Sequence, residues 1–376
     1  MLEKEEILKI DKLNISKDIY KLPDTIIQAR NNCKSSIDYE SIKKIMESRE
    51  TQFFPKVCVI CGMGGSAISG DILSDYLKYS VEFPIITVRN YKLPKFVDKN
   101  SLVFVISYSG NTEETLSAFK EALERGGLIF AVSSNGKLKE FCKKAQVPFI
   151  SIPTGVTPRS AIGYLFTSLL VSVQELGLIE SVDEQISEMI EVLKVLRDEI
   201  SIKVALEDNI AKQIALKCVN NIPVIYSDTD YESITTRFKT QFNENSKIPC
   251  KTGVFSEINH NEIVGWECSM EMSKKFISLL LRTDESEPIK TRIELTKSIL
   301  LKEKLSDVIE IYARGESKLC KIFSLIIIGD FISLYLAILN SRDPSATESI
   351  DKLKKAMKEQ LDTVQAIENE LFSKEE

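Results

Sequence analysis

The sequence predicts an α/β fold of two doubly wound domains with mainly parallel sheets, preceded by a helical lead-in and followed by a C-terminal helix. From residue 56, short apolar runs rich in β-branched residues alternate with amphipathic segments of helical period. The same alternation returns after residue 222, beyond a charged helical stretch at 182–203. Such alternation is typical of parallel sheets covered by helices on both faces, and 376 residues suffice for two of them.

Each half supplies its own elements. In the first half we expect strands at 57–61, 85–88, 102–106, 128–132 and 147–152, and helices at 67–77, 113–126 and 159–176. In the second half we expect strands at 223–226, 276–281 and 308–312, and helices at 233–243, 289–301 and 319–339. Further helices are expected at 18–29, 38–49 and 345–371. The predicted boundaries are therefore 1–49 for the lead-in, 50–203 and 204–343 for the two domains, and 344–376 for the C-terminal helix.

The composition is that of an ordinary soluble protein, with 43% hydrophobic and 28% charged residues. A formal net charge of −6 argues against a nucleic-acid or anionic-membrane partner. The charged start at 3–6 leads us to expect no signal peptide and a cytoplasmic location. The apolar stretch 322–339 is long enough to cross a membrane, but Asp330 in its middle would cost about 2.5–3.5 kcal/mol there. A buried helix is the better interpretation.

The cysteines and the single histidine do not suggest a metal site. Eight cysteines are scattered along the chain without the spacing of a disulfide framework or a zinc motif. Cys58 and Cys61 form a CxxC pattern, but they lie in one predicted strand, where a spacing of three places them on opposite faces. We therefore expect reduced and mostly buried thiols and no bound metal.

The most informative motif is the hydroxyl-rich segment after the strand expected at 102–106. Ser107, Ser109 and Thr112, with Gly110 among them, lie where this strand ends and the next helix begins. Free backbone N–H groups at a helix N-terminus attract anions, and the hydroxyls add hydrogen bonds without a lysine. A turn with good capping residues is the simpler alternative, but such a turn does not need three hydroxyls. The segment predicts a phosphate-binding turn.

A glycine-rich loop, Gly62-Met63-Gly64-Gly65-Ser66-Ala67, follows the first strand and opens a helix. Glycines here allow the backbone to approach an anion or a sugar closely. The spacing also fits a loose dinucleotide fingerprint, but an NAD site would require an acid after the next strand, where Arg89 stands instead. Arg89 could serve the 2′-phosphate of NADP, so an NADP-dependent oxidoreductase stays an alternative.

Two polar segments of the second half could transfer protons. Glu244 lies among amides at a predicted helix end, and His260 has asparagine and glutamate neighbours at 256–262. Imidazole titrates near neutral pH, and a carboxylate can act as a general base. A solvated helix end followed by a hairpin fits the same residues, which by themselves leave catalysis open.

Together these motifs resemble the archaeal-type bifunctional phosphoglucose/phosphomannose isomerases, built from two sugar-isomerase (SIS) domains. The matching stretches cover nearly the whole chain from the first strand onward. They are 62–67, 107–115, 157–159, 243–245, 259–262 and the tail beginning Asp343-Pro344. The resemblance implies an aldose–ketose isomerase that interconverts glucose 6-phosphate and mannose 6-phosphate with fructose 6-phosphate through a cis-enediol(ate). It implies no cofactor, and a homodimer in which His260 reaches into the partner's site.

The resemblance also assigns substrate contacts. The residues that would bind the phosphate or line the sugar are Gly64, Gly65, Ser66, Ser107, Ser109, Thr112 and Thr347. The hydroxyls at 107–112 would hold the phosphate, and the glycine loop would line the sugar. Thr347 stands at the position that the family associates with room for both C2 epimers.

The catalytic roles follow in the same way. Arg159 would stabilise charge on the enediolate, and Glu244 would move the proton between C1 and C2. His260 and a C-terminal lysine would open the sugar ring. Lysines crowd at 352–355, and matching the tail to the family's terminal Leu-Lys favours Lys354 over Lys352 and Lys355.

A non-catalytic SIS-fold sugar-phosphate sensor is the alternative from another class of protein. It would keep the phosphate-binding turn but has no need of Glu244 and His260. Such sensors usually carry a basic DNA-binding segment, which the lead-in of this chain lacks.

Overall fold

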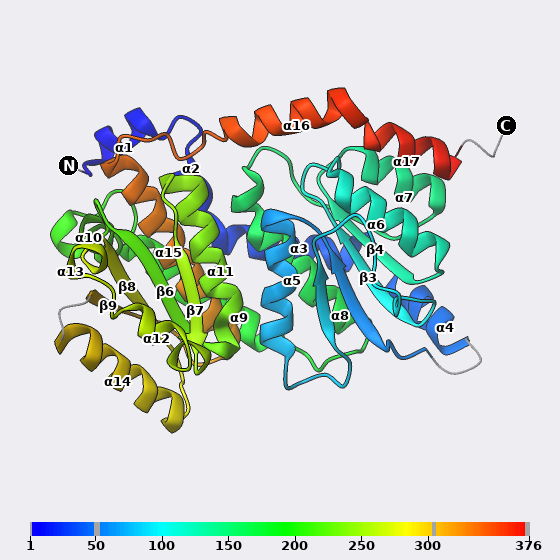
Figure 1. Ribbon diagram of the computed structural model, residues 1–376. Coiled ribbons are helices and arrows are strands. Elements are labelled where there is room, and N and C mark those ends of the chain that lie inside the picture. Colours follow the sequence, from blue (N-terminus) through cyan, green and yellow to red (C-terminus); the bar gives the residue numbers. More distant parts are fainter. Residues whose placement is uncertain (1, 49–52, 303–305, 373–376) are drawn as a thin grey trace. The chain divides into compact units, whose positions relative to one another are not determined.

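The computed structural model describes residues 2–48, 53–302 and 306–372, which form two compact units (Figure 1). Unit 1 comprises Met1–Pro23 and Asp183–Ala346, and unit 2 comprises Asp24–Val182 and Thr347–Glu376. Each unit contains one parallel sheet, so the predicted fold class is confirmed. The domain boundaries drawn from the sequence stay a prediction, and the boundary at 49/50 lies outside the described residues.

Unit 2 holds a five-stranded parallel sheet in the order β2-β1-β3-β4-β5. Its strands are β1 (Val57–Cys61), β2 (Ile85–Val88), β3 (Ser101–Ile106), β4 (Leu128–Ser133) and β5 (Phe149–Ser151). All five were expected from the sequence. The central strands β1 and β3 are buried along their whole length, as continuous apolar runs predict.

The helices that cover the two faces of this sheet and surround it are α3 (Leu22–Ser36), α4 (Tyr39–Ser48), α5 (Gly64–Leu77), α6 (Glu113–Glu124), α7 (Lys137–Ala145), α8 (Ile162–Glu175) and α17 (Thr363–Phe372). Helix α16 (Glu348–Leu361) belongs to the same unit but does not cover the sheet. Alternate strand residues Val59, Cys61 and Val103 join a core with side chains of α6 and α7. On the other face Ile60 packs against α5 at Gly70. Cys58 and Cys61 therefore point to opposite faces, as their spacing predicts.

The C-terminal segment is two helices and not the single helix expected at 345–371. The break is Asp362, which adopts a left-handed conformation with φ 35° between α16 and α17. Helix α17 packs along α6 (Figure 1), and its Ile367 is buried in the core of unit 2. Glu368 pairs with Lys137 at 3.0 Å. Helix α16, by contrast, has no buried residue.

Unit 1 holds a four-stranded parallel sheet in the order β7-β6-β8-β9. Its strands are β6 (Ile222–Asp228), β7 (Lys251–Phe255), β8 (Phe276–Arg282) and β9 (Asp307–Tyr312). Three of them were expected, and the edge strand β7 was missed. Its helices are α1 (Lys4–Ile10), α2 (Ile15–Tyr20), α9 (Asp183–Glu199), α10 (Ile210–Lys217), α11 (Glu232–Gln241), α12 (Glu262–Gly265), α13 (Met270–Ser273), α14 (Glu287–Lys302) and α15 (Lys318–Leu339).

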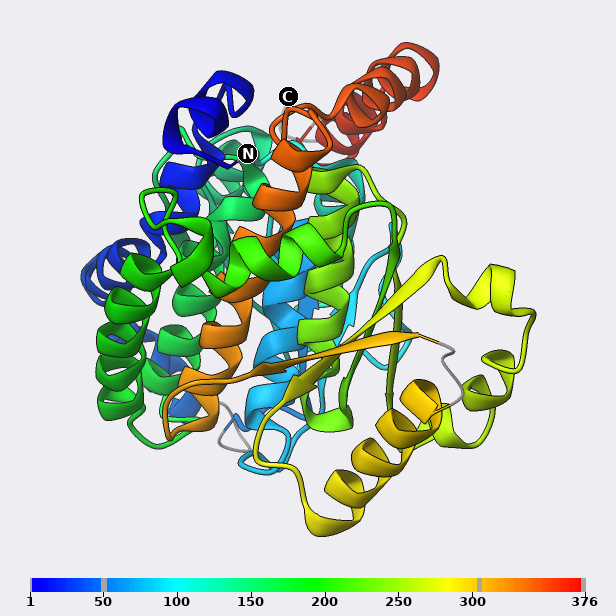
Figure 2. The same ribbon diagram turned by 90° about the vertical axis from the view of Figure 1, so that its left-hand side faces the viewer.

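Helices α11 and α15 lie on one side of this sheet and α14 on the other (Figure 2). On the α14 side, Val224, Tyr226 and Leu280 form a core with Ile293 and Leu300. Helix α15 is the one described helix that is long and apolar enough to cross a membrane, and 94% of its apolar window is buried inside the protein. The expectation of a buried helix at this position is confirmed.

Candidate active site

The glycine loop and the hydroxyl-rich segment lie at the same edge of the unit 2 sheet. Strands β1 and β3 are neighbours, yet the chain leaves β1 toward β2 and leaves β3 toward β4. The turns after β1 and β3 therefore open at a topological switch point, on the edge formed by the carboxyl ends of the strands. This is where doubly wound sheets bind their ligands, and both predicted segments lie there.

The hydroxyls after β3 form a connected turn. The Oγ of Ser107 lies 2.9 Å from Oγ1 of Thr112, and it also accepts a hydrogen bond of 3.1 Å from the N–H of Gly110. Ser107 is buried, whereas Ser109 is exposed. Thr112 is the N-cap of α6, but its side chain makes no cap hydrogen bond. Its hydroxyl therefore joins that of Ser107 at the start of the helix, where an anion is favoured.

Gly110 is required by the way this turn packs. Its φ is +71°, and an added Cβ would stand 1.6 Å from the carbonyl oxygen of Asn135. The loop at Asn135 is fixed in turn, because its carbonyl accepts a bond of 2.9 Å from Oγ of Ser133. Oδ1 of Asn111 accepts a bond of 2.9 Å from the N–H of Lys137. The turn is thus built against the β4–α7 loop.

The glycine loop contacts the turn that carries Arg159. An added Cβ at Gly65 would lie 3.0 Å from the carbonyl oxygen of Pro158 and 3.3 Å from Cα of Arg159. Arg159 is buried in a 3₁₀ turn, Pro158–Ala161, where the sequence predicted a helix start. Gly64 has φ +50° and is exposed, and Ser66 is buried. The structure thus brings the glycine loop and Arg159 together within unit 2.

Thr347 and the three candidate lysines lie on α16. Thr347 is the N-cap residue of this helix, and its Oγ1 lies 3.3 Å from Oδ2 of Asp351. Lys352 lies 4.0 Å from Glu348, and Lys355 lies 4.0 Å from Glu359. Lys354 is exposed and, among the described residues, has no such ion-pair partner. All three lysines are exposed, so the choice of Lys354 stays a prediction.

Glu244 lies in unit 1, in a π-helical turn, Phe242–Ser246, that follows α11 directly. Such turns occur frequently at functional sites. The Glu244 carbonyl accepts a hydrogen bond of 2.6 Å from Nζ of Lys247, which ends the turn with φ +58°. The Glu244 side chain is half-buried. Because the turn lies between α11 and the start of β7, it is at the edge formed by the amino ends of the strands.

His260 lies beyond the other end of β7. It follows a 3₁₀ turn, Glu257–Asn259, and its side chain is exposed. Within the described part of the chain, its imidazole has no hydrogen-bond or ion-pair partner. Asn259, next to it, is fixed to α14 by a bond of 2.8 Å from Nδ2 to Oγ1 of Thr296. The turn that carries His260 is therefore fixed to α14, while the imidazole itself is exposed to solvent.

Glu262, the acidic neighbour of His260, is already engaged. The Tyr226 hydroxyl donates to it, and Lys251 pairs with it at 3.1 Å. Burial, followed by the bond to Glu262, raises the pKa of Tyr226. The indole N–H of Trp266 donates to the Tyr226 oxygen at 3.1 Å. Glu262 thus belongs to a packed network with Tyr226, Lys251 and Trp266, and the choice of Glu244 as the base stays a prediction.

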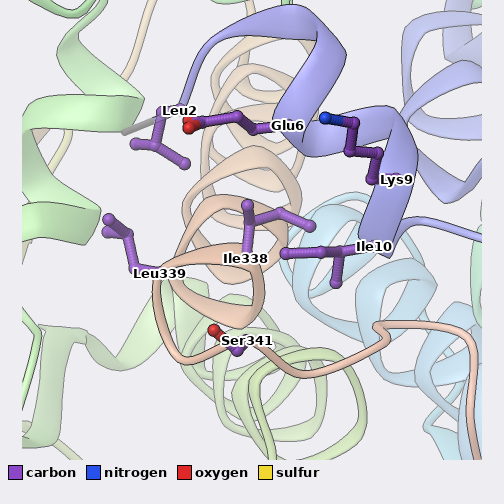
Figure 3. Close-up of a pocket in the computed structure, with 7 residues that line it drawn as sticks. All are labelled: Leu2, Glu6, Lys9, Ile10, Ile338, Leu339 and Ser341. Atoms are coloured by element: carbon purple, nitrogen blue, oxygen red, sulfur yellow. The ribbon is translucent and has the colours of Figure 1, made fainter.

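Other features do not compete with these sites. No group of three or more His, Cys, Asp or Glu side chains in the described ranges is arranged to hold a metal ion. Arg89, considered for an NADP phosphate, is paired with Asp71 of α5. A cavity between α1 and the C-terminal end of α15 (Figure 3) is lined by Leu2, Ile10, Ile338 and other residues, but by none of the predicted site residues.

The parallel sheets and the hydroxyl-rich turn at the switch point are those of a sugar-phosphate isomerase of the SIS class. Residues 207–357 match the family model of the bacterial phospho-glucose isomerase C-terminal SIS domain. The chain is 43% identical to a bifunctional phosphoglucose/phosphomannose isomerase of Caldicellulosiruptor bescii, over 91% of this chain and 98% of that protein. It is 37% identical to the protein of the same name from Aquifex aeolicus, over 81% and 91% of the two chains.

The chain belongs to the bifunctional phosphoglucose/phosphomannose isomerase family. Its fold is also similar to the crystal structure of a glucose-6-phosphate isomerase like protein from Thermus thermophilus, with a TM-score of 0.60 at 17% identity. That likeness covers 92% of this chain and 98% of the other. The predicted family is therefore confirmed.

Sequence reasoning missed the residues that support the site. Asn111, Asn135 and Lys247 hold backbone or loop atoms next to the proposed functional groups. Asn111 could have been suspected from its place within the hydroxyl-rich motif. Lys247 and Asn135 carry no local signal, because their partners depend on how loops meet in space.

Proposed function

We propose that this protein interconverts glucose 6-phosphate and mannose 6-phosphate with fructose 6-phosphate through a cis-enediol(ate) intermediate. The observation that carries this proposal is the hydroxyl-lined turn from Ser107 to Thr112, which lies at the topological switch point of the unit 2 sheet. The family to which the chain belongs supports the same reaction. Serine and threonine hydroxyls together with the first N–H groups of α6 suit a phosphate dianion. The phosphate takes no part in the chemistry and anchors the sugar, so that binding energy goes into positioning.

The reaction first opens the sugar ring. The O1 hydroxyl loses its proton, the C1–O5 bond breaks, O5 gains a proton and C1 becomes an aldehyde. His260 and Lys354 are the groups that we assign to these proton transfers. An imidazole can take or give a proton near neutral pH, and an ammonium group can donate one. The exposure of both side chains supports this assignment.

The isomerisation itself needs one base and one cation. Glu244 removes the proton from C2, the electron pair forms the C1=C2 bond, and negative charge develops on O1. Arg159, beside the sugar-lining Gly64, Gly65 and Ser66, stabilises that charge. Glu244 then returns the proton to C1 while the proton of the O2 hydroxyl passes to O1, so that O1 becomes a hydroxyl and C2 becomes the carbonyl. These steps balance without an oxidant, a reductant or a metal.

We further propose that the enzyme is a homodimer in which His260 serves the partner's site. Glu244 precedes β7 and His260 follows it, and five residues of strand span roughly 16 Å. The two residues therefore lie at opposite edges of the unit 1 sheet, which favours their serving different sugar sites. Val264, in the short helix α12 that follows His260, is an apolar residue with 60% of its surface exposed, which suits a surface that another chain covers.

The activity is tested with the purified protein in coupled assays, starting from each of the two aldose phosphates. We expect turnover of both, and no loss of activity after exhaustive treatment with EDTA. Binding of sugar phosphates without turnover would favour the sensor alternative. If glucose 6-phosphate is converted but mannose 6-phosphate is turned over only at the background rate, only the bifunctional part of the proposal fails. A loss of activity on EDTA treatment that a divalent ion restores would contradict the metal-free mechanism. A cytoplasmic location stays a prediction.

The base is tested with Glu244→Gln, which keeps the shape of the side chain and removes its basicity. We expect turnover to fall at least about 10²–10⁴-fold while sugar-phosphate binding is retained. Glu262→Gln is the matched control, since Glu262 is held by Tyr226 and Lys251. Near-normal turnover of the Glu244 variant, with loss in the Glu262 or Glu257 variant, would show that the base is misassigned.

The dimer is tested by mixing two inactive variants, Glu244→Gln and His260→Gln, and letting subunits exchange. If His260 acts across a two-fold interface, each mixed dimer has one site with both native groups, and about a quarter of wild-type activity returns. If His260 acts within its own chain, no site is complete and no activity returns. A monomer in solution would equally contradict the proposal.

A further inference from the structure

Two polar side chains lie in the middle of α15, the most apolar helix of the protein. Asp330 and Ser333 are both buried, with 3% and 0% of their surface exposed. Buried polar groups are costly unless they are hydrogen-bonded, and both are. The carboxylate of Asp330 accepts a hydrogen bond of 2.6 Å from Arg237 and one of 2.7 Å from Nε2 of Gln241. These two bonds fix the last turns of α11. Ser333 lies one helical turn further along.

Ser333 holds the two residues that directly follow Glu244. Its Oγ accepts a hydrogen bond of 2.9 Å from Nδ2 of Asn245, and its carbonyl accepts one of 2.6 Å from Oγ of Ser246. The same Oγ donates to the carbonyl of Asp330 at 2.7 Å, which sets the direction of its lone pairs. We infer that Ser333, acting through Asn245, is a positioning residue for the Glu244 carboxylate. This inference rests on the proposed role of Glu244 as the base.

The π-helical turn explains why Glu244 needs such support. The turn departs from the regular hydrogen-bond pattern of the α-helix, so its local sequence alone does not define its geometry. Two contacts hold it instead. Ser333 binds Asn245 and Ser246, and Lys247, the residue that ends the turn, binds the Glu244 carbonyl through Nζ, which also lies 3.2 Å from the carbonyl of Pro344. A base that must meet a C–H bond within a narrow range of geometry depends on such a frame.

Ser333→Ala removes the acceptor for Asn245 and leaves the carbonyl bond to Ser246 in place. Ser324→Ala is the matched control on the same helix. Ser324 is also fully buried. Its hydroxyl accepts a hydrogen bond of 2.8 Å from the N–H of Arg314 and donates one of 2.9 Å to the carbonyl of Lys321. Both variants remove one buried hydroxyl with the same pattern of bonds, but only Ser333 faces the turn of Glu244.

We expect Ser333→Ala to lower kcat about tenfold, with KM changed by less than about twofold, because a displaced base affects the transition state and leaves substrate binding alone. Ser324→Ala should leave both constants near wild type at a similar thermal midpoint. Ser333→Thr, which keeps the oxygen, should recover most of the lost kcat. In a Glu244→Gln background, Ser333→Ala should have no further effect on the residual rate.

Each other outcome overturns the inference in a recognisable way. If Glu244→Gln is inactive but Ser333→Ala has a wild-type kcat, Ser333 does not position the base, although the proposed function stands. If Ser333→Ala lowers the rate equally in the Glu244→Gln background, it acts elsewhere. If Glu244→Gln is fully active, the base assignment fails, and the role of Ser333 fails with it.

Discussion

Gly65 faces the carbonyl oxygen of Pro158, so the glycine loop packs directly against the turn that carries Arg159. An added Cβ would lie 3.0 Å from that oxygen, a contact so tight that the opposing backbone would have to move by a few tenths of an ångström. The opposing atoms belong to the backbone, so they cannot rotate away as a flexible side chain would. The glycine therefore sets how deep the Arg159 turn lies against the start of α5.

Gly65→Ala should push the turn of Arg159 outward. We expect kcat to fall about tenfold with a smaller change in KM, since Arg159 is assigned to charge that develops on the way to the enediolate. The free energy of unfolding should fall by about 1–3 kcal/mol, as overpacking usually costs. Steady-state kinetics and thermal unfolding measure the two effects.

The control for this variant is Gly127→Ala, at the opposite edge of the same sheet. Its added Cβ would meet the tip of the Val103 side chain at 3.2 Å rather than a backbone atom. It should keep the wild-type kinetic constants. A Gly65→Ala enzyme with unchanged kcat would show that the contact has no role in placing Arg159.

Thr112→Val should weaken substrate binding more than turnover. The phosphate contacts the hydroxyl equally in the ground and transition states, so KM rises while kcat stays near wild type. A lost hydrogen bond to a charged group is worth about 1.5–3 kcal/mol, or roughly one to two decades in KM. Thr112→Ser, which keeps the bond to Ser107, should lie close to wild type. Ser117→Ala on the same helix serves as the control. A large fall in kcat at constant KM in the Thr112→Val enzyme would contradict the assignment of Thr112.

Thr347→Gln should suppress the mannose 6-phosphate reaction more than the glucose 6-phosphate reaction. One base can serve both C2 epimers only if the intermediate can turn about C2–C3, which requires space beside the sugar. A larger side chain at the start of α16 should fill that space and lower the ratio of the two kcat/KM values about tenfold. Ser349→Gln, exposed on the same helix, should leave the ratio unchanged. An unchanged ratio in the Thr347 variant would mean that another residue provides the room.

Thiol titration should divide the eight cysteines into two groups. Six are buried, and burial raises the pKa of Cys61, Cys142, Cys218 and Cys320 to about 12, so little thiolate forms at pH 8. Cys250 and Cys268 are the two partly exposed cysteines, and burial also raises the pKa of Cys250 to about 12. We expect a disulfide reagent such as DTNB to modify at most these two in the folded protein, with Cys250 reacting slowly, and all eight thiols in guanidinium chloride. Three or more thiols reacting quickly in the folded state would contradict the burial seen here.

The buried strands were predictable from the sequence because each is a continuous apolar run bounded by turn residues. Strand β7 was not, since Lys251-Thr252-Gly253-Val254-Phe255 lacks such a run and exists through its pairing with β6. Gly253 within it leaves space for Ile258. Strand pairing at a sheet edge is a tertiary effect that local propensity does not contain. The break at Asp362 was missed because a residue in a left-handed conformation interrupts an otherwise regular helical pattern.

The candidate site was predictable to the extent that its chemistry lies in short contiguous motifs. Ser107 to Thr112 lie together in the chain and also in space. The frame around Glu244 could not be found in this way, since Ser333 is 88 residues from Asn245 and lies in a helix whose sequence indicates only burial. Polar residues in such a helix are nevertheless a usable signal, because each must find a partner.

The division of the chain into two discontinuous units has a consequence for its synthesis. Each unit takes up two separated stretches of the polypeptide, so the chain passes from one unit to the other after Pro23, Val182 and Ala346. Ile367, near the end of the sequence, is buried in the same core as Phe141, and Phe372 packs against that core. A ribosome that extends the chain thus delivers the last core residues of unit 2 only after both stretches of unit 1 have been made. Neither unit can complete its folding as an early, self-contained product of translation.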